Sequence, residues 1–208
     1  MVYITHSGEN KEKTDAILRV AQERFGLYGF AKTTMREIAA EMDISKASLY
    51  YYFPDKESLF KAVIGKEQND FFELMEYKLT ALEQAAEMLM EFSNVRLAYF
   101  KSFLNLSKLR VSEFPNFNIQ LGYLSQGLEA RELEIVTKIM EKGKAAGEFF
   151  ISDCLSTAQL YLDLFRGLRI VMLKRKEPVN ISQEDYDVME KHMSEFVNIF
   201  ITGISNLK

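Results

Sequence analysis

The side chains in this sequence best suited to contacting another molecule lie in one short run, Ser45–Phe53. Leu49 and the phenylalanine that ends the run are four residues apart, so on a helix they share one face and can be buried together. The other side chains of the run then project outward, and they are small, hydroxyl-bearing, aromatic or cationic. Lys46 can donate hydrogen bonds to guanine, Ser48 can bond a base or a phosphate, and Ala47 can contact a thymine methyl group. This pattern is typical of a helix that contacts base edges in the major groove of DNA.

Hydrogen-bond donors also lie on both sides of this run, where contacts to the DNA backbone would orient the helix. Thr34 precedes one short apolar pattern and Lys56 begins another, and the start of a helix attracts anions such as phosphate. Three successive tyrosines, residues 50–52, cannot share one helix face, so at least one of them is predicted to be exposed. The predicted DNA-contacting residues are Thr33, Thr34, Arg36, Ser45, Lys46, Ala47, Ser48, Tyr50, Tyr51, Tyr52 and Lys56.

Three helical patterns would position these side chains. The first covers residues 11–28, and Gly29 is predicted to end it in the left-handed conformation. Thr34 and Glu37 have the spacing of a capping box, in which each side chain satisfies a free amide at the start of the second helix. A tight turn at Asp43 follows, and Ser45 is a good N-cap for the third helix. Three helices in roughly 45 residues, with a short turn between the last two, indicate a helix-turn-helix.

The ordered string of residues over positions 11–64 closely resembles the signature of the TetR family. By that resemblance, the outer residues of the third helix touch bases, and Thr34, Tyr52 and Lys56 grip phosphates. One position departs from the family pattern, because Asp43 stands in the turn where the family usually has glycine. Aspartate tolerates the left-handed conformation better than most residues, so we expect a small strain and an intact motif. The residues that carry the resemblance are Phe25, Gly29, Phe30, Thr33–Ala39, Ser45–Phe53 and Lys56–Leu59.

The rest of the chain reads as long helices. Only three prolines and ten glycines occur in 208 residues, which favours helices over a turn-rich β architecture. The sequence therefore predicts an all-α protein of about nine helices, with a helix-turn-helix domain at residues 1–56 and a larger helical bundle for effector binding and dimerisation at 57–208. The long helices are expected at residues 55–78, 82–109, 118–146, 153–174 and 183–205.

Large, soft side chains are concentrated in the middle of the chain. They can be the core of a helical bundle, or they can line a ligand pocket between helices, as the family resemblance implies. Few charged residues interrupt this stripe, so a small, mostly apolar effector is the predicted ligand. The candidate ligand-binding residues are Tyr99, Phe100, Phe103, Phe114, Phe117, Tyr123 and Met140.

The last two predicted helices each carry more apolar surface than one packing face requires. One stripe can pack on the chain's own bundle and the other on a partner, although purely internal burial is the alternative. The resemblance implies a four-helix interface made by these two helices from each of two chains. The candidate dimer residues are Leu160, Leu164, Gly167, Val171, Met193, Phe196 and Phe200.

Composition limits the remaining possibilities. The net charge is −4, so a DNA-binding surface must concentrate its cations locally. The single cysteine, Cys154, suits a reducing compartment, and the sequence shows neither an export signal nor a membrane span, so a cytoplasmic protein is expected. His6 and His192 lie far apart and have no metal-ligand spacing. No catalytic motif is visible, so we expect no enzyme, no cofactor and no metal.

These observations support a DNA-binding transcriptional regulator, in the form of a ligand-responsive repressor. As a homodimer it would bind a near-palindromic operator in double-stranded DNA. The alternative is a helical ligand-binding or scaffold protein whose helix-turn-helix is only a packing unit. That alternative predicts weak, sequence-blind DNA binding, whereas an enzyme would require titratable groups clustered in a cleft.

Overall fold

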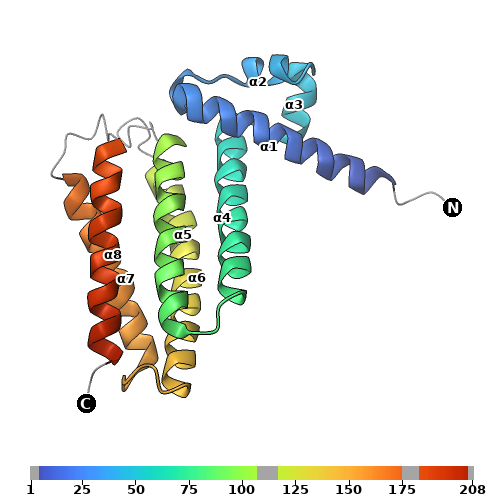
Figure 1. Cartoon of the computed structure of the whole chain (residues 1–208). Coiled ribbons are helices and arrows are strands. Elements are labelled where there is room, and N and C mark those ends of the chain that lie inside the picture. Colours follow the sequence, from blue (N-terminus) through green and yellow to red (C-terminus); the bar gives the residue numbers. More distant parts are fainter. Residues whose placement is uncertain (1–4, 107–116, 175–182, 206–208) are drawn as a thin grey trace. The chain divides into compact units, whose positions relative to one another are not determined.

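The computed structural model describes residues 5–106, 117–174 and 183–205, and these segments are almost entirely helical (Figure 1). The described residues form eight helices and no strand, which confirms the all-α prediction and comes close to the expected count of about nine. The long pattern near residues 118–146 forms one unbroken helix. The helices are α1 (Thr5–Lys32), α2 (Met35–Glu41), α3 (Lys46–Tyr52), α4 (Lys56–Thr80), α5 (Ala85–Leu106), α6 (Phe117–Ala145), α7 (Cys154–Lys174) and α8 (Gln183–Ser205).

The chain divides into two compact units, and α4 belongs to both of them. Residues 1–70 and 102–118 form the first unit, and residues 71–101 and 119–208 form the second. The predicted domain boundary after residue 56 lies at the start of α4, whereas packing groups the first half of this helix with α1–α3. The helix itself is continuous across the division.

Three phenylalanine rings form the centre of the first unit. Phe25 and Phe30 of α1 stack with their ring centroids 5.7 Å apart, and Phe60 of α4 meets both rings edge-on at 5.0 and 5.1 Å. All three side chains are buried. Such aromatic clusters combine large apolar burial with favourable ring geometry, so this one holds the first half of α4 against α1.

Side-chain caps define the ends of α2 and α3. The Oγ1 of Thr34 accepts a hydrogen bond from the amide of Glu37, and the Glu37 carboxylate accepts one from the amide of Thr34, which confirms the predicted capping box. At the end of α2, the amide of Asp43 bonds the carbonyl of Ala40 and the next amide, of Ile44, bonds that of Ala39. This is a Schellman motif, and it places Asp43 at a φ of 53°, as predicted.

Gly29 takes a positive φ of 79°, but its ψ is 163°. The predicted left-handed helical conformation, which needs a ψ near 45°, is therefore wrong at this residue. The backbone kinks here and one further helical turn follows, because the amide of Thr33 bonds the carbonyl of Gly29 at 3.2 Å. Ser45, in contrast, caps α3 as predicted, with its Oγ accepting from the amide of Ser48 at 3.0 Å.

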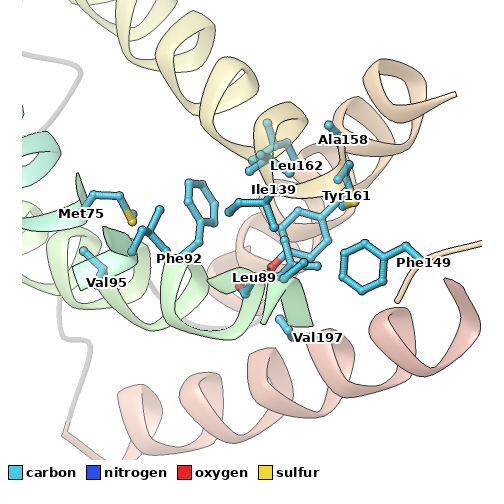
Figure 2. Packing of buried hydrophobic residues seen from close by; sticks show 14 of the residues in the cluster. Met75, Leu89, Phe92, Val95, Ile139, Phe149, Ala158, Tyr161, Leu162 and Val197 are labelled. Carbon is cyan, nitrogen blue, oxygen red and sulfur yellow. Dashed lines mark hydrogen bonds between the residues drawn. The ribbon is translucent and has the colours of Figure 1, made fainter. Parts of the chain in front are cut away.

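The second unit is held by a core that draws on all five of its helices (Figure 2). Tyr161 of α7 is fully buried there, and its hydroxyl is hydrogen-bonded to Ser93 of α5. Burial raises the pKa of the Tyr161 phenol. Its ring also contacts Phe196 and Phe200 of α8, with centroids 5.7 and 5.0 Å apart. One tyrosine thus joins three helices.

The turn after α6 depends on two glycines. Gly147 has a φ of 73° and donates its amide to the carbonyl of Lys144, while the amide of Glu148 bonds the carbonyl of Gly143, which makes a second Schellman motif. The ring of Phe149 then folds back over Gly143 so closely that a β-carbon on Gly143 would lie 2.2 Å from it. Phe149 is 2% exposed and belongs to the core.

A network of charged side chains crosses the interior of the second unit. Glu132 of α6 is 1% exposed and pairs with Arg96 of α5 through one oxygen and with Arg166 of α7 through the other. The guanidinium of Arg96 also lies 5.8 Å from the ring centre of Tyr99. Such a network is favourable only when its members satisfy one another, because burying a lone charge is costly. The expectation that charges hardly interrupt the apolar stripe is wrong at these residues.

None of the helices, over the residues that are described, has a segment sufficiently long and apolar to span a lipid bilayer.

Candidate nucleic-acid interface

The outward face of α3 presents the side chains that the sequence singled out. Leu49 is fully buried beneath the helix and Phe53 is buried just after it, as their spacing predicted. Residues 45, 46, 47, 50 and 51 are exposed, and Ser48 and Tyr52 are half-buried. A seven-residue helix held down by one leucine and one phenylalanine therefore offers the rest of its surface for contact.

Aromatic contacts hold two of the exposed side chains in place. The Lys46 ammonium lies 5.4 Å from the ring centre of Tyr50, one helical turn later, in a cation–π arrangement. Tyr51 is 78% exposed, and its ring is supported edge-on by Tyr52 at 5.3 Å. Side chains that are ordered before binding lose less entropy on binding, so this geometry favours contact with a second molecule.

The N-terminus of α2 adds two more exposed candidates. Arg36 and Thr34 are both open to solvent. The hydroxyl of Thr34 is committed to the Glu37 carboxylate at 2.7 Å, and this contact is the first cause that keeps the pKa of Glu37 below its usual range. Thr34 therefore already serves as a cap, and a phosphate contact would have to share its hydroxyl.

Thr33 was predicted to contact DNA, and the structure contradicts that prediction. Its side chain is 1% exposed, and its hydroxyl donates to the carbonyl of Gly29 at 2.8 Å and lies 3.2 Å from that of Arg24. Thr33 closes the kink in α1 and has no surface left for a ligand. The neighbouring threonine, Thr34, has the same side chain, but that side chain is exposed to solvent.

Lys56, the predicted phosphate clamp at the start of α4, has a structural role. Its ammonium donates to the carbonyls of Phe30 at 2.8 Å and Thr33 at 2.9 Å, and it lies 4.3 Å from the ring centre of Phe30. Partial burial lowers the pKa of this ammonium group. Two of its three N–H donors thus tie α4 to the end of α1, and the third is left for another acceptor.

Sequence reasoning missed one contact that braces this surface. Arg24 of α1 forms an ion pair with Glu41, the last residue of α2, and its guanidinium lies 5.3 Å from the ring centre of Tyr28. The spacing of 17 residues between the two partners gives no periodic signal, so only the fold brings them together.

The candidate ligand residues are only partly covered by the structure. Tyr99 is half-buried with its ring centre 4.5 Å from that of Phe71, and Met140 is fully buried in the core. Phe114 lies outside the described residues, as do the side chains of Phe100, Phe103, Phe117 and Tyr123.

The candidate dimer residues differ in their exposure and fall into three groups. Leu160, Leu164 and Val171 of α7 are 54%, 46% and 48% exposed, which is unusual for large apolar side chains. Gly167, Phe196 and Phe200 are intermediate, whereas Met193 is 2% exposed. Met193 has no surface to offer a partner, so its inclusion was wrong. Ile199 of α8, which is 72% exposed, was overlooked.

A metal site would require several histidine, cysteine or carboxylate side chains close together. The described residues contain no group of three or more histidine, cysteine, aspartate and glutamate side chains that could hold an ion.

Comparisons with known proteins place this geometry in context. Residues 17–63 match the family model described as "Bacterial regulatory proteins, tetR family". The chain is 25% identical over 193 residues to the HTH-type transcriptional regulator QacR of Staphylococcus aureus, a match that covers 92% of this chain and 97% of QacR.

Solved structures extend the likeness to the whole fold. A transcriptional regulator from Cytophaga hutchinsonii is 39% identical, with a TM-score of 0.85 over 93% of this chain and 99% of that one. A protein of Saccharomonospora viridis described as a transcriptional regulator, crystallised with choline, shares the fold at 21% identity, with a TM-score of 0.71 over 90% of this chain and 96% of that one. With its capped helix-turn-helix and outward-facing α3, this chain belongs to the TetR family of DNA-binding transcriptional regulators.

Proposed function

We propose that the protein is a homodimeric, ligand-responsive repressor that binds a near-palindromic operator through two copies of α3. The observation that carries this proposal is the outward face of α3, where Lys46, Tyr50 and Tyr51 are exposed and held in place by aromatic contacts. In this proposal Lys46, Ala47 and Ser48 meet base edges, and Tyr51 and Arg36 meet the backbone or the groove wall.

The proposed dimer interface lies on α7 and α8. The exposed side chains of Leu160, Leu164 and Val171 lie on α7, and Ile199 adds apolar surface from α8. Gly167 lines a hollow of about 540 Å³ between the two helices, where a crossing helix of a second copy can approach closely. An isologous contact of this kind gives the two-fold symmetry that a palindromic operator requires.

The proposed effector site lies in the second unit, where a small molecule would shift the equilibrium between DNA-binding and released states by binding them with different affinity. The Saccharomonospora viridis regulator, which shares this fold, was crystallised with choline, and this supports a small-molecule effector. Tyr99 and Met140 remain candidate contacts. Because Arg96 and Glu132 are buried beside Tyr99, the effector need not be mostly apolar.

We propose a regulator without enzymatic activity that works in the cytoplasm.

The proposal is tested by selecting genomic DNA fragments with the purified full-length protein at several salt concentrations. A recovered palindrome, bound about 10³-fold or more tightly than random DNA, is the expected result. The Tyr51→Ala variant should lose most of that preference, while Tyr77→Ala, which removes an equally exposed tyrosine from α4, should keep it. Generic binding with a steep salt dependence and no motif would instead favour a structural helix-turn-helix.

A further inference from the structure

A groove of about 440 Å³ lies in the second unit, and neither Tyr99 nor Met140 lines it. Its walls come from the second half of α4, the start of α5 and one face of α6. The apolar side chains that line it include Phe72, Leu79 and Ile139, which are buried, and Ile135 and Met88, which are half-buried. A hollow with an apolar floor and a few polar groups is the usual form of a small-molecule site.

The α6 face of this groove has an apolar centre and a cation at each end. Ile135, Ile139 and Lys142 follow one another at spacings of four and three residues, so they form a single stripe along the helix. Arg131 marks the opposite end of the groove, where its guanidinium stacks 3.8 Å from the ring centre of Phe72. The eleven residues between Arg131 and Lys142 correspond to about 16 Å of helix.

Two carboxylates, Glu76 and Glu134, and three cations, Arg131, Lys138 and Lys142, line the groove. Glu134 pairs with Lys138 at 2.6 Å, and the hydrogen bond and charge of Glu134, followed by the charges of Glu141 and Glu76, raise the pKa of the Lys138 ammonium. Lys142 differs, because the only hydrogen bond of its side chain within the described residues is one of 3.3 Å to the backbone carbonyl of Leu82. The lining side chains therefore carry one more positive than negative charge. Lys142 places an ammonium group, without an ion pair among the described residues, at one end of the apolar channel.

We propose that this groove binds an amphiphilic organic anion, an alkyl carboxylate of medium chain length, with its head at Lys142 and its chain over Ile139 and Ile135. The Lys142 ammonium has donors available for a carboxylate, and the apolar floor removes the alkyl chain from water. The helix α4 both lines this groove and begins with Lys56 in the first unit. A bound carboxylate that shifts α4 would therefore change DNA binding by the first unit through one continuous helix. That last consequence rests on the proposed function, whereas the binding itself does not.

Binding is measured by calorimetry on the full-length protein, with dodecanoate below its micelle-forming concentration as the probe. Dodecanoate should bind at least tenfold more tightly than dodecyltrimethylammonium, which has the same chain and the opposite charge. Lys142→Met should weaken dodecanoate binding about tenfold or more. The control is Lys144→Met, because Lys144 is a lysine two residues further along that bonds the carbonyl of Ser152 and does not line the groove.

The position of the ligand is read from methyl signals of labelled methionines, with Met88→Leu used for assignment. The Met88 signal should shift when dodecanoate is added, because this side chain lines the groove, whereas that of Met35 in the first unit should not. Equal or tighter binding of the cation, unchanged affinity in Lys142→Met, or an unmoved Met88 signal would each overturn the inference. Operator binding measured without any ligand tests the proposed function separately.

Discussion

Glu67 is a carboxyl group at a position where helices usually bury an apolar side chain. It lies on α4, is 7% exposed, and accepts one hydrogen bond, from the side-chain amide of Gln22 of α1 at 2.8 Å, while its second oxygen has no partner among the described residues. The two charged groups that act on it most, Asp70 and Lys66, lie on α4 itself and pair with each other. Burial raises the pKa of Glu67 to about 7.

This raised pKa predicts a pH-dependent stability. The folded state holds the Glu67 proton more tightly than the unfolded state. The contribution of Glu67 to the free energy of unfolding is therefore complete below about pH 4.5 and is lost as the pH rises through about 7. At pH 8 the free energy of unfolding of the Glu67→Gln variant should therefore be about 2 kcal/mol higher than that of the parent. At pH 5 the difference should be much smaller. Urea unfolding at both pH values tests this. An identical gain at both values, or one matched by the exposed Asp70→Asn control, would argue against it.

Asp43 provides a second prediction at the residue scale. It adopts a φ of 53° in the turn between α2 and α3, a conformation that costs most L-residues about 1 kcal/mol and costs glycine almost nothing. Asp43→Gly should therefore raise the free energy of unfolding slightly, by about 0.5 kcal/mol, and leave operator binding intact. Asp43→Val, which adds a branched β-carbon, should lower it. A loss of stability in the glycine variant, measured by denaturant titration, would mean that the aspartate carboxylate stabilises the turn.

The end of α6 requires glycine at position 143, because the ring of Phe149 lies where a side chain would be. A β-carbon at Gly143 would lie 2.2 Å from the ring of Phe149, which is itself buried in the core. Gly143→Ala should therefore destabilise the protein by about 2 kcal/mol, because either the ring or the turn must move. Gly127→Ala is the matched control on the same helix, since nothing lies within 4 Å of its added carbon, and it should stabilise by a few tenths to about 1 kcal/mol. Thermal unfolding of both variants separates packing from helix propensity.

Helix boundaries were predictable where a specific residue punctuates the chain. Thr34, Ser45 and Gly147 act through local hydrogen bonds, and the sequence alone contains the information for such bonds. Buried charges were also within reach, because Glu132 continues the apolar spacing of Leu128 and Val136 on α6. A charged residue at a core position predicts a buried partner, although the identity of that partner, Arg96 or Arg166, depends on the fold.

Other features of the site could not be predicted because they depend on how separate segments meet. Thr33 and Thr34 are adjacent hydroxyl residues, and only the kink at Gly29 decides that one is buried and the other exposed. In the same way, the position of Lys56 at the start of α4 predicts an exposed cation. In the structure its ammonium instead donates hydrogen bonds to the carbonyls of Phe30 and Thr33. Long-range hydrogen bonds of this kind leave no periodic trace in the sequence.

At the scale of the whole molecule, the proposed dimer predicts that operator affinity depends on the surface of α7. Leu164→Glu places a charge in the proposed interface on α7, where burial of an unpaired carboxylate is costly. It should weaken dimerisation about 100-fold and reduce operator affinity with it, as sedimentation and binding titrations would reveal. Leu74→Glu on α4 is the control, because Leu74 is similarly exposed and lies outside that face. An unchanged dimer in Leu164→Glu would exclude this surface.

The exposure of Tyr51 has an optical consequence. The chain has ten tyrosines and no tryptophan, so its ultraviolet emission comes from phenols alone. Tyr51 emits from water, whereas Tyr161 emits from the dry core of the other unit. A bound duplex that stacks on the outer ring would quench the first and leave the second unchanged. A tryptophan placed at residue 51 would be the only one in the molecule. Its fluorescence would therefore report the binding and release of DNA by α3 without any added dye.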